Sequence, residues 1–234
     1  MIISPLSERY DWEVEWISAS PHFNIERMLR VNVKGFKKIK ALESLASVGV
    51  MGKEQLSQIF RLNKKEIEEM VRNGLLIEHK LIRNNEAVMP IVTLGYAGAL
   101  AIKLDNYEEN YWFQINETEI LRHILFYQLY SRFSQFSQCE ILATPHPFTG
   151  SIVNKGSMLY VYVLKDNISD FARYLRWNKK EHHCVVIVTE DYKKLTQIEM
   201  FLNEIKLRVV LEADLFKKNI NNIFYRYQDG KLIK

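Results

Sequence analysis

Apolar side chains recur with the period of an α-helix in three short stretches, residues 36–47, 53–60 and 63–73. Only Arg61 and Leu62 separate the second stretch from the third. A joint this short forces a sharp turn between two helices. The pattern therefore predicts three successive helices, of which the last two form a helix-turn-helix.

The ends of these helices carry local signals. Asn63 is a good N-cap for the third helix, and Glu66 lies three residues later, where its side chain can close a capping box. Gly74 is placed to be the glycine that follows a helix C-terminus, and Gly49 can end the first helix. We therefore expect well-defined helix ends.

After Gly74 the pattern becomes that of strands. Residues 75–82 and 87–92 flank a turn-rich tip at residues 83–86. This arrangement predicts a β-hairpin. Thr93 is then expected to cap a short helix over residues 94–102.

The run from Asn73 to Ile102 resembles the hairpin, or wing, of winged-helix regulators. In that family Gly-Leu-Ile leads into the wing and a Thr-x-x-Gly motif follows it. This chain has Gly74-Leu75-Leu76 and Thr93-Leu94-Gly95 at those places. The resemblance implies a winged helix-turn-helix over residues 36–102 and, with it, DNA binding.

The second half of the chain has a different organisation. Residues 103–115 are polar and aromatic without a clear period, so we expect a linker and the domain boundary there, followed by a long helix over residues 116–133. Strand and helix patterns then alternate: strands over 139–144, 150–154, 158–164, 183–189 and 208–212, helices over 168–177, 191–205 and 214–224, and a hairpin-like turn at Asp229-Gly230. Residues 183–189 are continuously apolar, as in a strand buried on both faces. The prediction is an α/β domain with a mixed sheet over residues 116–234, which makes the whole chain α+β or α/β.

This element order resembles the core of the PD-(D/E)xK nuclease-like fold. A winged helix followed by such a domain also resembles the replication-relaxation family of plasmid and mobile-element proteins. The nuclease chemistry requires carboxylates that hold a divalent cation beside a lysine.

At the corresponding places only the lysine of that motif matches. His146 stands where the first acid is needed, and Val163 stands two residues before Lys165. Glu140 belongs to the preceding strand, and Asp166 is expected to point away from Lys165. We therefore expect a catalytically inactive copy, with no catalytic residue, bound metal or cofactor.

Composition agrees with a globular chain, with 47% hydrophobic and 26% charged residues. No apolar run approaches the ~20 residues that cross a bilayer, and the N-terminus lacks a signal-peptide pattern, so we expect a cytoplasmic protein without membrane contact. Cys139 and Cys184 are expected to be buried free thiols. The adjacent residues His182 and His183 would point to opposite faces of a strand and do not form a metal site.

The charge is unevenly distributed along the chain. Residues 26–83 hold 13 Lys and Arg against 7 Asp and Glu, whereas residues 1–25 and 84–138 each have a net charge of −3. A basic segment between acidic flanks is typical of a phosphate-binding face. Residues 1–35 are expected to form an N-terminal arm that packs on the body or on a second subunit, and its aromatic residues are Tyr10, Trp12, Trp16 and Phe23.

In a winged helix the third helix enters the major groove and the hairpin reaches the DNA backbone or the minor groove. By this analogy the DNA-binding residues are Lys37, Lys38, Arg61, Lys64, Lys65, Arg72, Lys80, Arg83, Asn84 and Asn85. Glu68 and Glu69 oppose this interpretation, because carboxylates on the same helix repel phosphate.

The sequence thus predicts a sequence-specific protein that binds double-stranded DNA as a homodimer. Its role would be that of a regulator, or of a replication or transfer accessory factor, of a plasmid or mobile element. The C-terminal domain would supply dimer contacts, contacts with a protein partner or further backbone contacts to DNA. Two alternatives stay open: an interaction scaffold that uses the winged helix without DNA binding, and a divergent metal-dependent nuclease.

Overall fold

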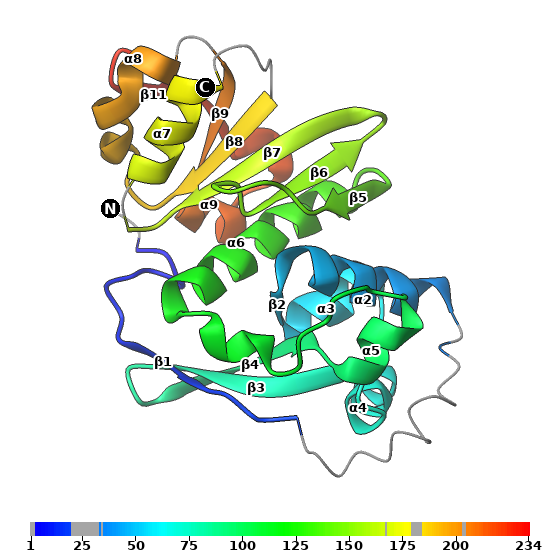
Figure 1. The fold of residues 1–234 in the computed structure, drawn as a ribbon. Coiled ribbons are helices and arrows are strands. Elements are labelled where there is room, and N and C mark those ends of the chain that lie inside the picture. Colours follow the sequence, from blue (N-terminus) through cyan, green and yellow to red (C-terminus); the bar gives the residue numbers. More distant parts are fainter. Residues whose placement is uncertain (1–2, 20–32, 34, 167, 179–183, 203–204) are drawn as a thin grey trace. The chain divides into compact units, whose positions relative to one another are not determined.

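The computed structural model describes residues 3–19, 33, 35–166, 168–178, 184–202 and 205–234 (Figure 1). The protein is α+β, and one of its sheets is mixed. It divides into two compact units, Tyr10–Ile124 and Met1–Arg9 together with Leu125–Lys234. We call the first the hairpin unit and the second the sheet unit. None of the described helices combines the length and the apolar character needed to span a membrane.

The hairpin unit is built from short helices and an antiparallel sheet. Its elements are β1 (Trp12–Glu15), α2 (Phe36–Val48), β2 (Val50–Gly52), α3 (Lys53–Phe60), α4 (Lys64–Arg72), β3 (Leu76–Arg83), β4 (Ala87–Leu94), α5 (Tyr96–Ala101) and the 3-10 helix η1 (Tyr111–Gln114). Among the described residues, the strand order is β1-β3-β4-β2.

The three predicted helices and the hairpin are confirmed. The apolar periodicity buries Leu42 and Leu45 of α2, and Ile67 and Met70 of α4, because these side chains recur on one face of each helix. Strands β3 and β4 pair from Leu76↔Leu94 to Arg83↔Ala87. The tip between them is formed by residues 84–86.

The expected cap of the helix after the hairpin was wrong. Thr93 lies inside β4 and is buried, and its hydroxyl is 2.8 Å from Nε2 of His79. The N-cap of α5 is Gly95 instead. A side chain there is excluded, because a Cβ would lie 2.3 Å from the carbonyl oxygen of Gly74.

The boundary between the units lies later than the expected linker at residues 103–115. That segment belongs to the hairpin unit, which ends at Ile124. The Tyr107 hydroxyl donates to the Leu94 carbonyl, the Tyr111 hydroxyl donates to the Gly49 carbonyl, and Trp112 is fully buried. The aromatic residues of this segment, which was predicted to be a linker, therefore pack into the core of the hairpin unit.

The sheet unit contains a seven-stranded mixed sheet among its described residues. Its elements are the end of α6 (Glu117–Ser134), then β5 (Cys139–Leu142), β6 (Gly150–Asn154), β7 (Ser157–Leu164), α7 (Ser169–Trp177), β8 (Cys184–Thr189), η2 (Tyr192–Ile198), α8 (Glu199–Leu202), β9 (Lys206–Leu211), α9 (Glu212–Lys217), η3 (Ile220–Asn222), β10 (Phe224–Gln228) and β11 (Lys231–Ile233). The strand order is β11-β10-β9-β8-β7-β6-β5. The three central strands, β7, β8 and β9, are parallel, and the flanking pairs are antiparallel.

Both faces of the central strands are buried, as the apolar run of β8 predicts. Val185 and Ile187 belong to the core that contains residues of α7, η2 and α8. The alternate residues Val186 and Val188 are also buried, and α9 lies across the opposite face of the sheet (Figure 1). Because both faces of these strands are buried, the polar side chains associated with them lie at the strand ends.

Two helices expected in the sheet unit are shorter than predicted. In place of the single helix expected over 191–205, the structure has η2 and the single turn of α8, which ends at Leu202, and Leu195 and Ile198 are buried at the three-residue spacing of a 3-10 helix. The helix expected over 214–224 ends at Lys217, and Phe224 pairs with Val210 in the sheet. The turn at Asp229-Gly230 and its hairpin are confirmed.

Cys139 and Cys184 are free thiols that are half-buried. His182, His183, Phe23 and most of the expected arm beyond Ala19 lie outside the described residues. Within the described residues, no group of three or more His, Cys, Asp or Glu side chains is placed to hold a metal ion.

Candidate nucleic-acid interface

The turn that leads into α4 is fixed by local hydrogen bonds. The Asn63 side chain accepts from the Glu66 N–H at 3.0 Å, and the Glu66 carboxylate accepts from the Asn63 N–H at 2.8 Å. The predicted capping box is therefore confirmed. Arg61 adopts a left-handed conformation, and the Ser57 hydroxyl donates to the Leu62 carbonyl, so the chain turns within the three residues between α3 and α4.

The C-terminus of α4 is equally well defined. The Gly74 N–H donates to the Val71 carbonyl and the Leu75 N–H donates to the Met70 carbonyl, which is the Schellman pattern. Gly74 has a φ of 66°, which an L side chain rarely adopts. Hydrogen bonds at both ends thus fix α4 in position, and with it the direction of its exposed face.

That exposed face carries a cluster of cations at the start of the helix. Arg61, Lys64 and Lys65 are exposed, and we call these three residues the basic end of α4. In the described part of the chain, Lys65 and Arg61 have neither an ion pair nor a side-chain hydrogen bond, and the same holds for Lys37 on α2 and Arg72 at the end of α4.

The acidic residues of α4 are paired with lysines. Lys38 of α2 donates to Glu69 at 3.0 Å, and Lys64 is 3.8 Å from Glu68. Both pairs reduce the negative charge that α4 presents. The pair with Glu69 also places Lys38 of α2 beside α4.

Three of the predicted hairpin residues contact strand β1, which pairs with β3 (Figure 1), or the two residues that precede it. Lys80 donates to Glu15 at 2.7 Å. The Arg83 guanidinium lies over the Tyr10 ring, 4.9 Å from its centroid. Asn84 and Asp11 exchange two hydrogen bonds through the Asn84 N–H and Oδ1 atoms, at 2.8 and 2.9 Å. Asn85 lies exposed at the tip.

The residues that follow β1 are held by hydrogen bonds to the hairpin unit. The Ile17 N–H donates to Nδ1 of the buried His79 at 3.0 Å, and the Ala19 N–H donates to Asn110 Oδ1 at 2.9 Å. Burial lowers the pKa of His79 to about 3, so the ring is neutral. Its Nδ1 accepts from Ile17 and its Nε2 donates to Thr93.

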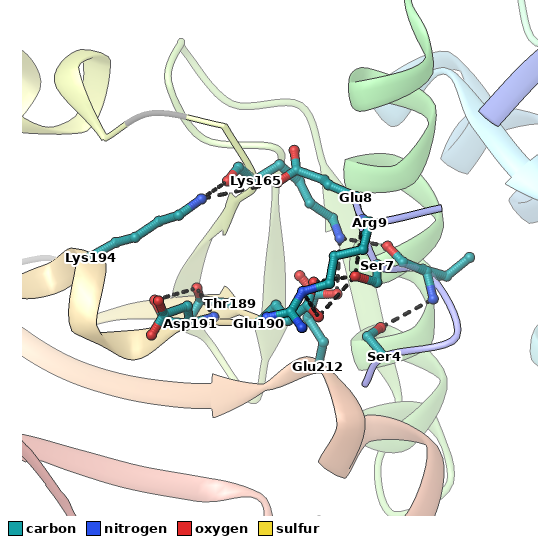
Figure 2. A network of polar contacts seen from close by, with 11 residues as sticks. Ser4, Ser7, Glu8, Arg9, Lys165, Thr189, Glu190, Asp191, Lys194 and Glu212 are labelled. Atoms are coloured by element: carbon teal, nitrogen blue, oxygen red, sulfur yellow. Dashed lines mark hydrogen bonds and ion pairs between the residues drawn. The ribbon is translucent and has the colours of Figure 1, made fainter. Parts of the chain in front are cut away.

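A second polar cluster lies in the sheet unit, where the parallel strands β7, β8 and β9 end (Figure 2). Lys165, which follows β7, donates to Glu212 at 2.9 Å and to the Leu6 carbonyl at 2.7 Å. The Ser7 hydroxyl lies 2.8 and 2.7 Å from the two carboxylate oxygens of Glu190, which follows β8. Residues 4–7 of the N-terminal segment are thereby fixed to the sheet.

The Lys165–Glu212 pair is buried, with 1% and 0% of the two side chains exposed. Burial raises the pKa of Glu212, and the neighbouring ammonium of Lys165 opposes that shift. The lysine predicted from the nuclease-like motif is therefore engaged in an internal ion pair and in holding the N-terminal segment. His146 is exposed in the loop before β6.

Two features of these sites were absent from the prediction. The pairing of β1 with the hairpin could have been suspected from the alternation Trp12-Glu13-Val14-Glu15, which has the period of a strand. The approach of Glu212 to Lys165 joins residues 47 positions apart and has no local signal.

No family model matches the chain, and no curated protein matches it.

Proposed function

We propose that the protein binds double-stranded DNA through its hairpin unit, with α4 in the major groove. The order helix, strand, helix, helix, hairpin over α2 to β4, with β2 joined to β4, supports a winged helix. The short turn between α3 and α4 supports the helix-turn-helix within it.

The observation that carries the proposal is the basic end of α4. Arg61, Lys64 and Lys65 lie exposed around the N-terminus of α4, where the helix dipole favours an anion. Side-chain charge and helix polarity therefore act in the same direction. A duplex backbone is the extended polyanion that such a surface fits.

The carboxylates of Glu68 and Glu69 do not remove this surface. Each has a lysine partner, and the Lys64–Glu68 pair lies at the surface. Exposed pairs of this kind contribute about 0–1 kcal/mol, so a phosphate can take the place of a carboxylate on Lys64 at small cost. Lys65 has no competing carboxylate partner among the described residues.

The test is a titration of fluorescein-labelled duplexes from the protein's own locus, followed by anisotropy at several salt concentrations. We expect the K64A/K65A variant to bind at least about tenfold more weakly, with a slope of log K against log salt that is smaller by about 1 for each lysine that contacts a phosphate. The control K206A/K231A removes the same charge from exposed lysines of the sheet unit. Equal binding by the two double variants would contradict the proposal.

The narrower role rests on the resemblance in the sequence. We propose a cytoplasmic regulator, or a replication or transfer accessory factor, of a plasmid or mobile element, acting as a homodimer on a specific site. A non-enzymatic role is supported by the ion pair of Lys165, which engages the lysine of the nuclease-like motif in holding residues 4–7. An interaction scaffold without DNA binding is the outcome if no duplex binds at low salt.

A further inference from the structure

We propose that strand β1 is a built-in competitor of DNA: Glu15 holds Lys80 of the β3–β4 hairpin, and a phosphate must displace that carboxylate before the hairpin can bind. The inference rests on the proposed function and specifies how the same surface is regulated. It assigns to the acidic N-terminal segment a role in setting DNA affinity.

The first support is that strand β1 and the residues that flank it contact hairpin residues that were predicted to bind DNA. Four polar residues of the hairpin were predicted to reach DNA, and three of them, all but Asn85, contact residues 10–15. Lys80 is bound by Glu15, Arg83 by the Tyr10 ring, and Asn84 by the backbone of Asp11. The segment thus covers the polar groups of β3 and of the tip next to it.

The second support is that the ion pair is exchangeable. Lys80 and Glu15 stand opposite each other in the β1–β3 register, and each side chain is 53% exposed. Water reaches both groups, so a phosphate can approach Lys80 without unfolding the strand. Only the lysine side chain has to change its partner.

The third support is the charge of the segment. Asp11, which precedes β1, and Glu13 and Glu15 on β1 are all exposed beside the hairpin, so they repel a duplex that approaches Lys80 and Arg83. At the basic end of α4 the only carboxylate near a lysine among the described residues is Glu68 of the same helix, 3.8 Å from Lys64, and Arg61 and Lys65 have no ion pair. Among the described residues, the N-terminal segment therefore contacts only the hairpin half of the proposed DNA surface.

The strand also stays at its place when the lysine is released. Immediately after β1, the Ile17 N–H is bound to the buried His79, and β1 itself is paired along β3. Glu15 is consequently always near Lys80, and competition is intramolecular. Removal of its charge should raise DNA affinity at any protein concentration.

The experiment compares E15Q with E13Q in the full chain, by anisotropy with the same duplexes and salt series. Both changes remove one exposed negative charge from β1, but only Glu15 holds Lys80. We expect E15Q to bind about two- to fivefold more tightly than E13Q, the range that corresponds to an exposed ion pair. In a K80A background the E15Q and E13Q changes should have equal effects.

Each outcome is decisive. Equal affinities of E15Q and E13Q would mean that only net charge matters and would overturn the inference while the proposed function stands. An advantage of E15Q that persists without Lys80 would overturn it as well. Absence of binding by the wild type and by every variant would instead contradict the proposed function itself.

Discussion

Two lysine–glutamate pairs contact the N-terminal segment, one through Glu15 and the other through the bond from Lys165 to the Leu6 carbonyl, and they differ in their surroundings. In the hairpin unit, Lys80 and Glu15 are 2.7 Å apart and both side chains are 53% exposed. In the sheet unit, Lys165 and Glu212 are 2.9 Å apart, with 1% and 0% exposed, and Lys165 also holds the Leu6 carbonyl. The two ion pairs thus have nearly equal N–O distances, although one is exposed to water and the other is buried in the protein.

Burial decides what each pair can do. An exposed pair exchanges its partners with water, salt or phosphate and contributes about 0–1 kcal/mol. A buried pair cannot lose one member without leaving a charge in an apolar environment, which costs about 3–5 kcal/mol. We therefore interpret Lys165–Glu212 as a permanent anchor of residues 4–7, and Lys80–Glu15 as a contact that a ligand can replace.

The largest expected effect is that of K165M on stability. The variant leaves Glu212 buried without its cation and the Leu6 carbonyl without its donor, so the free energy of unfolding should fall by about 3–5 kcal/mol. Urea denaturation followed by circular dichroism measures it. K80M is the matched control and should cost less than about 1 kcal/mol.

A second replacement separates charge from packing. If the lost pairing is the cause, adding E212L to K165M should recover much of the loss, because a buried ion pair can be replaced by apolar side chains of similar volume. If K165M and K80M lowered the free energy of unfolding equally, the distinction between the two pairs would be contradicted.

The next effect concerns His79, which holds the Ile17 N–H in the hairpin unit. Burial lowers the pKa of His79 to about 3, whereas in the unfolded chain the ring titrates near 6.5. Below pH 6.5 the unfolded state therefore takes up a proton that the folded state does not. As a result, the free energy of unfolding decreases as the pH is lowered. Between pH 7 and 5 the contribution of His79 is about 2 kcal/mol.

The measurement is urea denaturation at pH 7, 6 and 5 for the wild type and H79Q. The variant should show a smaller loss of stability between pH 7 and 5. His123, whose pKa burial lowers to about 4, contributes with the same sign in both proteins. Identical pH dependence of the two proteins would show that His79 does not stay neutral in the fold.

The smallest effect is that of the exposed pair on stability. E15Q should change the free energy of unfolding by less than about 1 kcal/mol, and by no more than E13Q does within the error of the method. The same change should nevertheless alter DNA affinity as described above. A loss of several kcal/mol in E15Q would mean that the pair is an anchor as well.

The sequence predicted those features that depend on neighbouring residues. The Asn63–Glu66 capping box, Gly74 after α4 and the Asn84-Asn85 turn are formed by side chains within a few positions, and each has one favoured geometry. The positions of the cations on α2 and α4 were predictable for the same reason, because the apolar periodicity predicts the helices that carry them.

Features that depend on distant residues were not predictable in this way. Residues 103–115 have no period, because their aromatic rings fill gaps between elements of the hairpin unit and form no face of their own. The anchor of residues 4–7 requires Lys165, Glu190 and Glu212 to meet at the ends of neighbouring strands. Only the strand order brings them together.

The most direct test of the account is lysine acetylation of the folded protein with and without a duplex, read out by mass spectrometry at each lysine. We predict that DNA protects Lys64 and Lys65 at the basic end of α4, that Lys206 and Lys231 react equally in both samples, and that buried Lys165 reacts in neither. Unchanged acetylation of Lys64 and Lys65 under conditions where the duplex is bound would contradict the central claim that α4 contacts DNA.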